Sequence, residues 1–137
     1  MTDYQQPRRL NAVSITLILL ALGACYWFWR FFPAYFDGWT VDHVLKESAA
    51  AVYRTNRLSE PERSQELRAL VDKTRADIIK KANVNDPELT VNLDIDGNLA
   101  TFTADYRVVV THPVTSRTTL LHFVKTQSSD IKAVSWK

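Results

Sequence analysis

The chain contains few of the residues on which most chemical sites depend. Its 137 residues include one cysteine, three glycines and three histidines. A single cysteine excludes an intrachain disulfide and leaves the redox compartment of the protein undetermined. Three glycines are too few to form the glycine-rich loops that bind phosphate groups. The composition therefore offers no sign of nucleotide binding.

An excess of charge of one sign is also missing from most of the chain. Residues 37–137 carry 14 Lys and Arg against 14 Asp and Glu, so the net charge of +2 arises in the amino-terminal part. A domain that binds nucleic acid usually has a strongly basic face. We therefore predict no nucleic-acid partner, and a segment of this size suffices for one small domain with one core.

The chain is rich in apolar residues near its amino terminus. Leu10 to Trp29 contains no charged residue, and at 1.5 Å per residue a helix of this length measures about 30 Å, the thickness of the hydrocarbon core of a bilayer. We therefore predict a transmembrane helix within residues 10–36. The lipid bilayer is accordingly the first partner that the sequence predicts.

The charges beside this segment predict its orientation. Arg8 and Arg9 precede it directly, and positive residues tend to stay on the cytoplasmic side of a membrane. Residues 1–9 are therefore predicted to be cytoplasmic. Residues 37–137 would then form a domain on the opposite side of the membrane.

Aromatic residues are concentrated where the predicted span ends. Residues 26–39, here termed the aromatic collar, contain nine of the 15 aromatic residues of the chain, as is typical where a helix passes from hydrocarbon to headgroups. Within the collar, Arg30 can extend toward lipid phosphates or pair with an acidic group on a neighbouring subunit. The residues predicted to contact the membrane interface or a partner are Tyr26, Trp27, Trp29, Arg30, Phe32, Tyr35, Phe36 and Trp39.

An alternative to a spanning helix is a cleaved and lipidated amino terminus. Leu22-Gly23-Ala24-Cys25 is similar to a lipobox, after which bacterial lipoproteins are cut and acylated at the cysteine. A lipoprotein usually continues with a polar tether, whereas Tyr26 to Trp29 is aromatic. The apolar continuation favours an uncut span, in which Cys25 is a small apolar helix residue.

The remaining residues predict two helices. Thr40 is a potential helix cap after two bend-prone residues, Pro33 and Gly38, and apolar residues at helical spacing continue to about Arg54. A second, amphipathic helix is predicted over residues 62–82. Its start has a capping box in Ser59-Glu60-Pro61-Glu62, and Asn83 is a carboxyl-cap candidate.

Beyond Pro87 the apolar period changes to two, which predicts strands. We expect an α+β domain: the transmembrane helix continues into a juxtamembrane helix, and the amphipathic helix packs on an antiparallel meander of three or four strands. The predicted strands are 89–95, 102–110 and 118–126, with a short last strand from Ile131 to Trp136. The predicted turns are Asp96-Gly97-Asn98, His112-Pro113 and Gln127 to Asp130.

Two patterns are candidate chemical sites. Asn92 to Gly97 has oxygen ligands at alternate positions, as in the first half of a calcium loop, but the twelfth position is Thr103 rather than a bidentate glutamate. His122 would lie diagonally across from Asp105 if the turn centres near residues 114–115, which makes a base and its orienting group without a nucleophile. No metal, cofactor or catalytic residue is predicted, so we expect no enzyme.

Three short segments stand out beside the amphipathic helix: Pro33-Ala34-Tyr35, Asp105-Tyr106-Arg107-Val108 and Leu120-Leu121-His122-Phe123. In these segments and this helix the chain resembles a family of short proteobacterial inner-membrane proteins. The family is catalogued as a domain of unknown function and is often encoded beside signal peptidase I. The resemblance implies one inner-membrane span, a periplasmic α+β domain and no assigned reaction.

Three functions are consistent with these features. We expect an accessory or structural subunit that docks on a larger membrane-protein complex, with other membrane-protein subunits as partners. A second hypothesis is a pilin-like or secretion-machinery component, because a long helix followed by a sheet resembles type IV pilins, although the early glutamate of pilins is missing. The third is a periplasmic lipoprotein or binding module anchored at Cys25.

Overall fold

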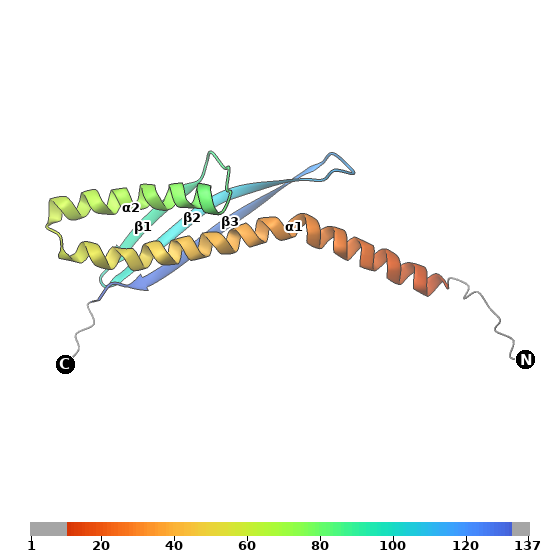
Figure 1. Ribbon diagram of the computed structural model, residues 1–137, viewed down its shortest axis with the longest axis horizontal. Helices are drawn as coiled ribbons and strands as arrows, with labels where there is room; N and C mark the ends of the chain where they lie inside the picture. The colour runs from red at the N-terminus through yellow and green to blue at the C-terminus, as the bar shows by residue number, and fades with distance from the viewer. Residues whose placement is uncertain (1–10, 133–137) are drawn as a thin grey trace, which may run out of the picture. The chain divides into compact units, whose positions relative to one another are not determined.

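A computed structural model describes residues 11–132 and divides the chain into two compact units, with the boundary between Phe32 and Pro33. The predicted α+β class is confirmed. The elements are α1 (Ala12–Ala51), the 3-10 helix η1 (Val52–Arg57), α2 (Glu60–Lys81), β1 (Thr90–Asp96), β2 (Leu99–Thr111) and β3 (Thr118–Asp130) (Figure 1). Helix α1 contributes residues to both units. The segment predicted to be cytoplasmic, residues 1–9, lies outside the described residues.

The first unit contains the apolar part of α1. Residues 12–29 are all exposed, and by length and composition α1 could cross a membrane. The hydroxyl of Thr16 donates a hydrogen bond of 2.9 Å to the carbonyl of Ala12, which satisfies this polar group within the helix itself. One candidate span near the amino terminus is therefore present, as predicted.

In the second unit α1 continues without a new start. The predicted cap at Thr40 is wrong, because α1 includes Pro33 and Gly38 and the Thr40 hydroxyl donates at 3.4 Å to the carbonyl of Phe36 within the helix. A threonine caps a helix only where preceding residues leave the helical conformation. One stripe of α1 at helical spacing is buried: Ala34, Gly38, Val41, Val44, Leu45, Ser48 and Ala49.

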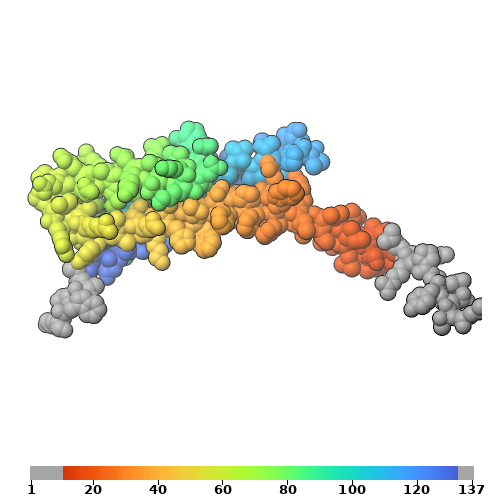
Figure 2. Space-filling view, in the orientation of Figure 1, coloured from red at the N-terminus to blue at the C-terminus, as the bar shows by residue number. Residues whose placement is uncertain are grey.

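Helix α2 lies along the carboxyl-terminal part of α1, where the hydroxyls of Thr74 and Ser48 are hydrogen-bonded at 2.8 Å (Figure 2). The predicted capping residue Ser59 is the N-cap, but its hydroxyl bonds to the carboxylate of Glu62 at 2.9 Å rather than to the backbone. Asn83 follows the helix with a φ of +51°, the left-handed conformation expected at its carboxyl end.

The three strands form an antiparallel sheet in the order β1-β2-β3. The predicted turn over residues 127–130 is wrong, because β3 continues to Asp130 and Ser128 pairs with Thr101 of β2. Pairing with a long neighbouring strand here overrides the turn preference of serine. Ile131 and Lys132 are not in a strand, and the rest of the predicted fourth strand lies outside the described residues.

The core lies between the helix pair and one face of the sheet. Strand β2 contributes Phe102 and Tyr106, which are 0% and 1% exposed, and α1 contributes Leu45 at 0%. The opposite face of the sheet, here termed the outer face, carries the odd-numbered residues of β2 and the even-numbered residues of β1 and β3. Residues of this face are partly or fully exposed, as the alternating sequence predicts.

Candidate functional site

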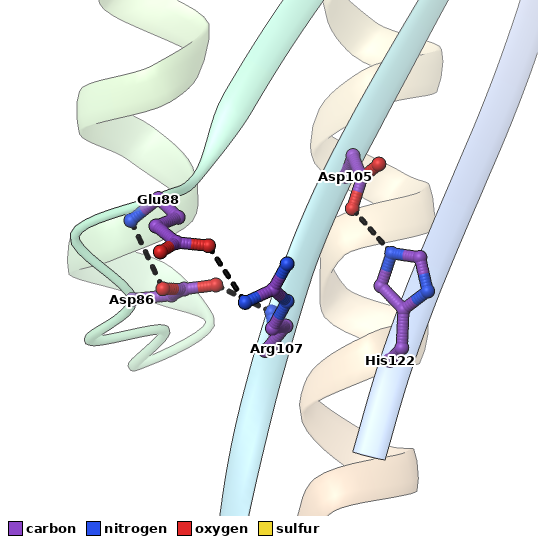
Figure 3. A network of polar contacts seen from close by, with 5 residues as sticks. All are labelled: Asp86, Glu88, Asp105, Arg107 and His122. Carbon is purple, nitrogen blue, oxygen red and sulfur yellow. Dashed lines mark hydrogen bonds and ion pairs between the residues drawn. The ribbon is translucent and has the colours of Figure 1, made fainter. Parts of the chain in front are cut away.

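The outer face brings together His122 and Asp105, as the sequence predicts. His122 Nε2 lies 2.6 Å from Asp105 Oδ1, and both side chains are about half exposed (Figure 3). The residues directly opposite this pair in the ladder are Arg107 and Val124 rather than a serine or cysteine. The arrangement is that of a diagonal cross-strand contact on an exposed surface.

A second polar cluster closes the end of the β1–β2 ladder. The Asp86 carboxylate accepts hydrogen bonds from the backbone N–H groups of Glu88 and Arg107, and the Arg107 guanidinium lies 2.7 Å from Glu88 (Figure 3). Strand β1 begins at Thr90, opposite Asp105. The next N–H group of β2 on this side belongs to Arg107, and β1 has no residue there to accept its hydrogen bond. These N–H groups, first that of Glu88 and then that of Arg107, lower the pKa of Asp86.

The sequence reading missed this cluster. Its only local signal is the Asp86-Pro87 dipeptide before the strand, which is typical of a turn. The predicted calcium-like segment forms no loop: Asn92 lies in β1 directly opposite Thr103, the residue at the twelfth position. Within residues 11–132 no cluster of three or more His, Cys, Asp or Glu is arranged to hold a metal ion.

On the inner face, a charged pair fastens β3 to α1. Lys125 Nζ lies 2.9 Å from Asp42, and the Gln127 amide lies 3.4 Å from the same carboxylate. Both members of the ion pair are less than one-third exposed. No local pattern in the sequence predicts a contact between residues so far apart in the chain.

An aromatic stack lies beside this pair. The ring of Phe123 contacts Tyr35 edge-on at 5.8 Å and stacks on Tyr106 at 5.5 Å. The Tyr106 hydroxyl is buried beside Gly38 and has no hydrogen-bond partner among the described residues. Burial, followed by the negative charges of Asp42 and Asp37, raises the pKa of Tyr106 to about 12.

The aromatic collar covers the surface of α1 without converging on one point. Trp29 is 83% exposed, whereas Arg30 is partly buried and Cys25 is exposed. Near Cys25, the side chains of Ala24, Trp27 and Phe28 line a shallow apolar concavity. The other predicted contact residues are also exposed on α1: Tyr26, Trp27 and Phe32 in the first unit, and Tyr35, Phe36 and Trp39 in the second.

Among residues 11–132, no strand pairs with the outer edge of β3. At the two ends of the β2–β3 ladder, the N–H of His112 bonds to the Arg117 carbonyl at 2.8 Å and the N–H of Ile131 bonds to the Asn98 carbonyl at 2.7 Å. Opposed residues of an antiparallel pair alternate between bonded and non-bonded. Both ends fit one register, in which the odd-numbered residues of β3 bond to β2.

The even-numbered residues of β3 therefore direct their backbone N–H and C=O groups away from β2. No described strand lies beyond β3 in the sheet. We term these outward groups, on residues 118–130, the β3 edge. They provide a row of donors and acceptors with which an extended chain could pair.

No protein-family model matches the chain, and no curated protein or solved structure is significantly similar to it.

Proposed function

We propose that the protein is a single-pass protein of the bacterial inner membrane, with a periplasmic domain, that acts as an accessory subunit of a larger membrane-protein complex. The apolar part of α1 would dock among other membrane helices. The β3 edge would bind an extended segment of a partner subunit. The observation that carries this proposal is the open edge of a strand that runs from Thr118 to Asp130.

The β3 edge lacks three of the features by which proteins prevent strand addition, namely proline, bulges and outward lysines. Its ladder with β2 is continuous from Thr118 to Asp130, and the strand contains no proline. Its one lysine, Lys125, lies on the inner face, where its charge is paired with Asp42. A partner strand could therefore pair with β3 without displacing any described contact.

The orientation of β3 favours a different protein, rather than a second copy, as the occupant. Tyr35 contacts Phe123, Asp42 binds Lys125, and the Asn56 amide donates to the Ile131 carbonyl, so β3 runs parallel to α1 in the second unit. Antiparallel pairing of two β3 edges about a two-fold axis would point the two Pro33 ends in opposite directions. Two copies whose β3 strands both run away from the same bilayer cannot pair in this way.

The experiment compares Val124→Pro with Val124→Thr in the full-length protein purified from its native membrane in mild detergent. The proline removes one outward N–H group and leaves the ladder with β2 intact, whereas threonine keeps the N–H group and β-branching. We expect photocrosslinks to a different protein, identified by mass spectrometry, from a reactive side chain at Thr126, and few from one at Asn92 on the far strand. The Val124→Pro protein should lose these crosslinks while its circular dichroism is unchanged.

Two results would overturn the proposal. One is a monomer without any crosslinked protein in native mass spectrometry. The other is a partner retained equally by the proline and threonine variants. The intact mass measured in the same experiment distinguishes the alternative functions, because a lipoprotein would begin at Cys25 with added lipid and a processed pilin would lack part of its amino terminus.

A further inference from the structure

The turn between β2 and β3, residues 112–117, is held in a defined shape. The N–H of His112 donates to the Arg117 carbonyl at 2.8 Å, and His112 Nε2 lies 2.9 Å from the Thr119 hydroxyl. Ser116 has a φ of +50°, which reverses the chain direction within the turn. The side chains on this turn are therefore presented from a fixed support.

The turn lies at the end of the second unit where α1 enters. Because β3 runs parallel to α1 and Phe123 contacts Tyr35, the residues before Phe123 extend past Tyr35 toward the Pro33 end. The five residues back to Thr118 add roughly 17 Å at 3.3 Å each. Strand β1 begins opposite Asp105, so it does not accompany this part of the hairpin, which projects beyond it (Figure 1).

The projecting part exposes apolar side chains at its tip. Val114 on the turn is 83% exposed, and Val109 and Leu120, which lie directly opposite each other on the outer face, are 61% and 59% exposed. Apolar side chains gathered at the tip of a hairpin are suited to contact another apolar phase or surface.

The charges around the tip are of one sign. Residues 106–129 contain no Asp or Glu. Arg107 and Lys125 are paired with Glu88 and Asp42, whereas the Arg117 side chain has no ion pair among the described residues. The tip therefore combines a protruding valine with a nearby guanidinium that can bind an anionic group.

We infer that the β2–β3 turn is a second membrane contact, which binds the headgroup region of the bilayer that α1 crosses. The inference rests on the membrane anchor of the proposed function. Under the proposed function, the bilayer lies near Pro33, because the anchor is joined to the second unit at that residue. Val114 would enter the headgroup layer, which is about 5–8 Å thick on each side, and Arg117 would bind lipid phosphate.

The test uses the full-length protein, with Cys25→Ser to remove its one cysteine, reconstituted into phosphatidylcholine vesicles with or without phosphatidylglycerol. An environment-sensitive fluorophore is attached through Thr115→Cys at the tip or, as the control, through Asn98→Cys in the turn at the opposite end of the sheet. Lipids with a quencher near the headgroup report contact. We expect strong quenching at position 115 in anionic vesicles and little at position 98.

Two further variants test the roles of the side chains. Arg117→Gln should lower the equilibrium constant for binding of the tip to anionic vesicles by about fivefold. Val114→Ser should reduce quenching with either lipid composition. Equal solvent exposure at positions 115 and 98 in vesicles that still float with the protein would overturn the tip contact alone. Protein that does not float with the vesicles would overturn the membrane anchor, and the tip contact with it.

Discussion

Substitution of Gly38 by alanine tests whether α1 is one continuous helix where it packs on the sheet. Glycine in a helix interior costs about 1 kcal/mol relative to alanine, because its backbone is less restricted in the unfolded chain. Gly38 is buried in α1 beside Tyr106 and Lys125. Glycine is required at such a contact if a Cβ atom would collide with these neighbours, and it is not required if there is room for one.

The distances show that there is room for a Cβ atom at position 38. A Cβ atom at position 38 would lie 3.4 Å from Tyr106 Oη and 3.5 Å from Lys125 Cε, which are ordinary van der Waals separations. We therefore expect Gly38→Ala to increase the free energy of unfolding by about 0.5–1 kcal/mol. For a domain of about 100 residues, 1 kcal/mol corresponds to a rise in Tm of about 4–8 °C.

The matched control is Gly97→Ala. Gly97 has a φ of +56° in the β1–β2 turn, with no atom near its missing Cβ, so alanine is strained there by backbone conformation alone. We expect this variant to lower stability by about 1 kcal/mol. Thermal unfolding in detergent, followed by circular dichroism of the sheet, measures both. A lower Tm for Gly38→Ala would refute the packing around Gly38 described above.

Four further predictions follow from particular contacts. Tyr106→Phe removes a buried hydroxyl without a partner, so urea unfolding should show unchanged stability or a gain of up to about 1 kcal/mol. The pKa of Asp86 lies below its usual 3.8, so ionised Asp86 contributes to the free energy of unfolding above about pH 4. This contribution is lost as the pH falls through the folded-state pKa, and Asp86→Asn should therefore reduce the difference in stability between pH 7 and pH 3. Thr74→Val and Ser48→Ala should each lower the free energy of unfolding by about 1 kcal/mol. The double variant should lose less than the sum of the two single losses, because the two residues share one hydrogen bond. In detergent, where copies no longer share an orientation, concentrated protein should dimerise through β3, and light scattering should show that Val124→Pro prevents this.

Local patterns were sufficient where neighbouring residues determine the structure. The apolar spacing and capping signals located α2 within about two residues of its bounds. The Asp96-Gly97 signal located the first hairpin, and the centre of the second turn correctly placed His122 beside Asp105. A hairpin register follows from its turn, so a contact across it can be read from the sequence.

The errors involve contacts between distant residues. The extension of β3 through Ser128 depends on its pairing with Thr101, and serine has no strand preference of its own. The ion pair between Asp42 and Lys125 joins a helix to a strand far along the chain. The β3 edge, which carries the proposed function, also depends on the order of the strands, and a single sequence does not specify which strand is left without a neighbour.

The membrane anchor also offers a physical reason why an unblocked edge would be tolerated. A soluble protein with an open strand risks pairing with further copies, and proline or outward lysine commonly prevents it. Under the proposed topology, anchored copies share one orientation, and where their β3 strands run away from the bilayer, the two edges cannot meet antiparallel. Confinement to one membrane also raises the effective concentration of an anchored partner, so a modest backbone contact would suffice for binding. The anchor would thus exclude the unwanted pairing that the β3 sequence itself does not prevent.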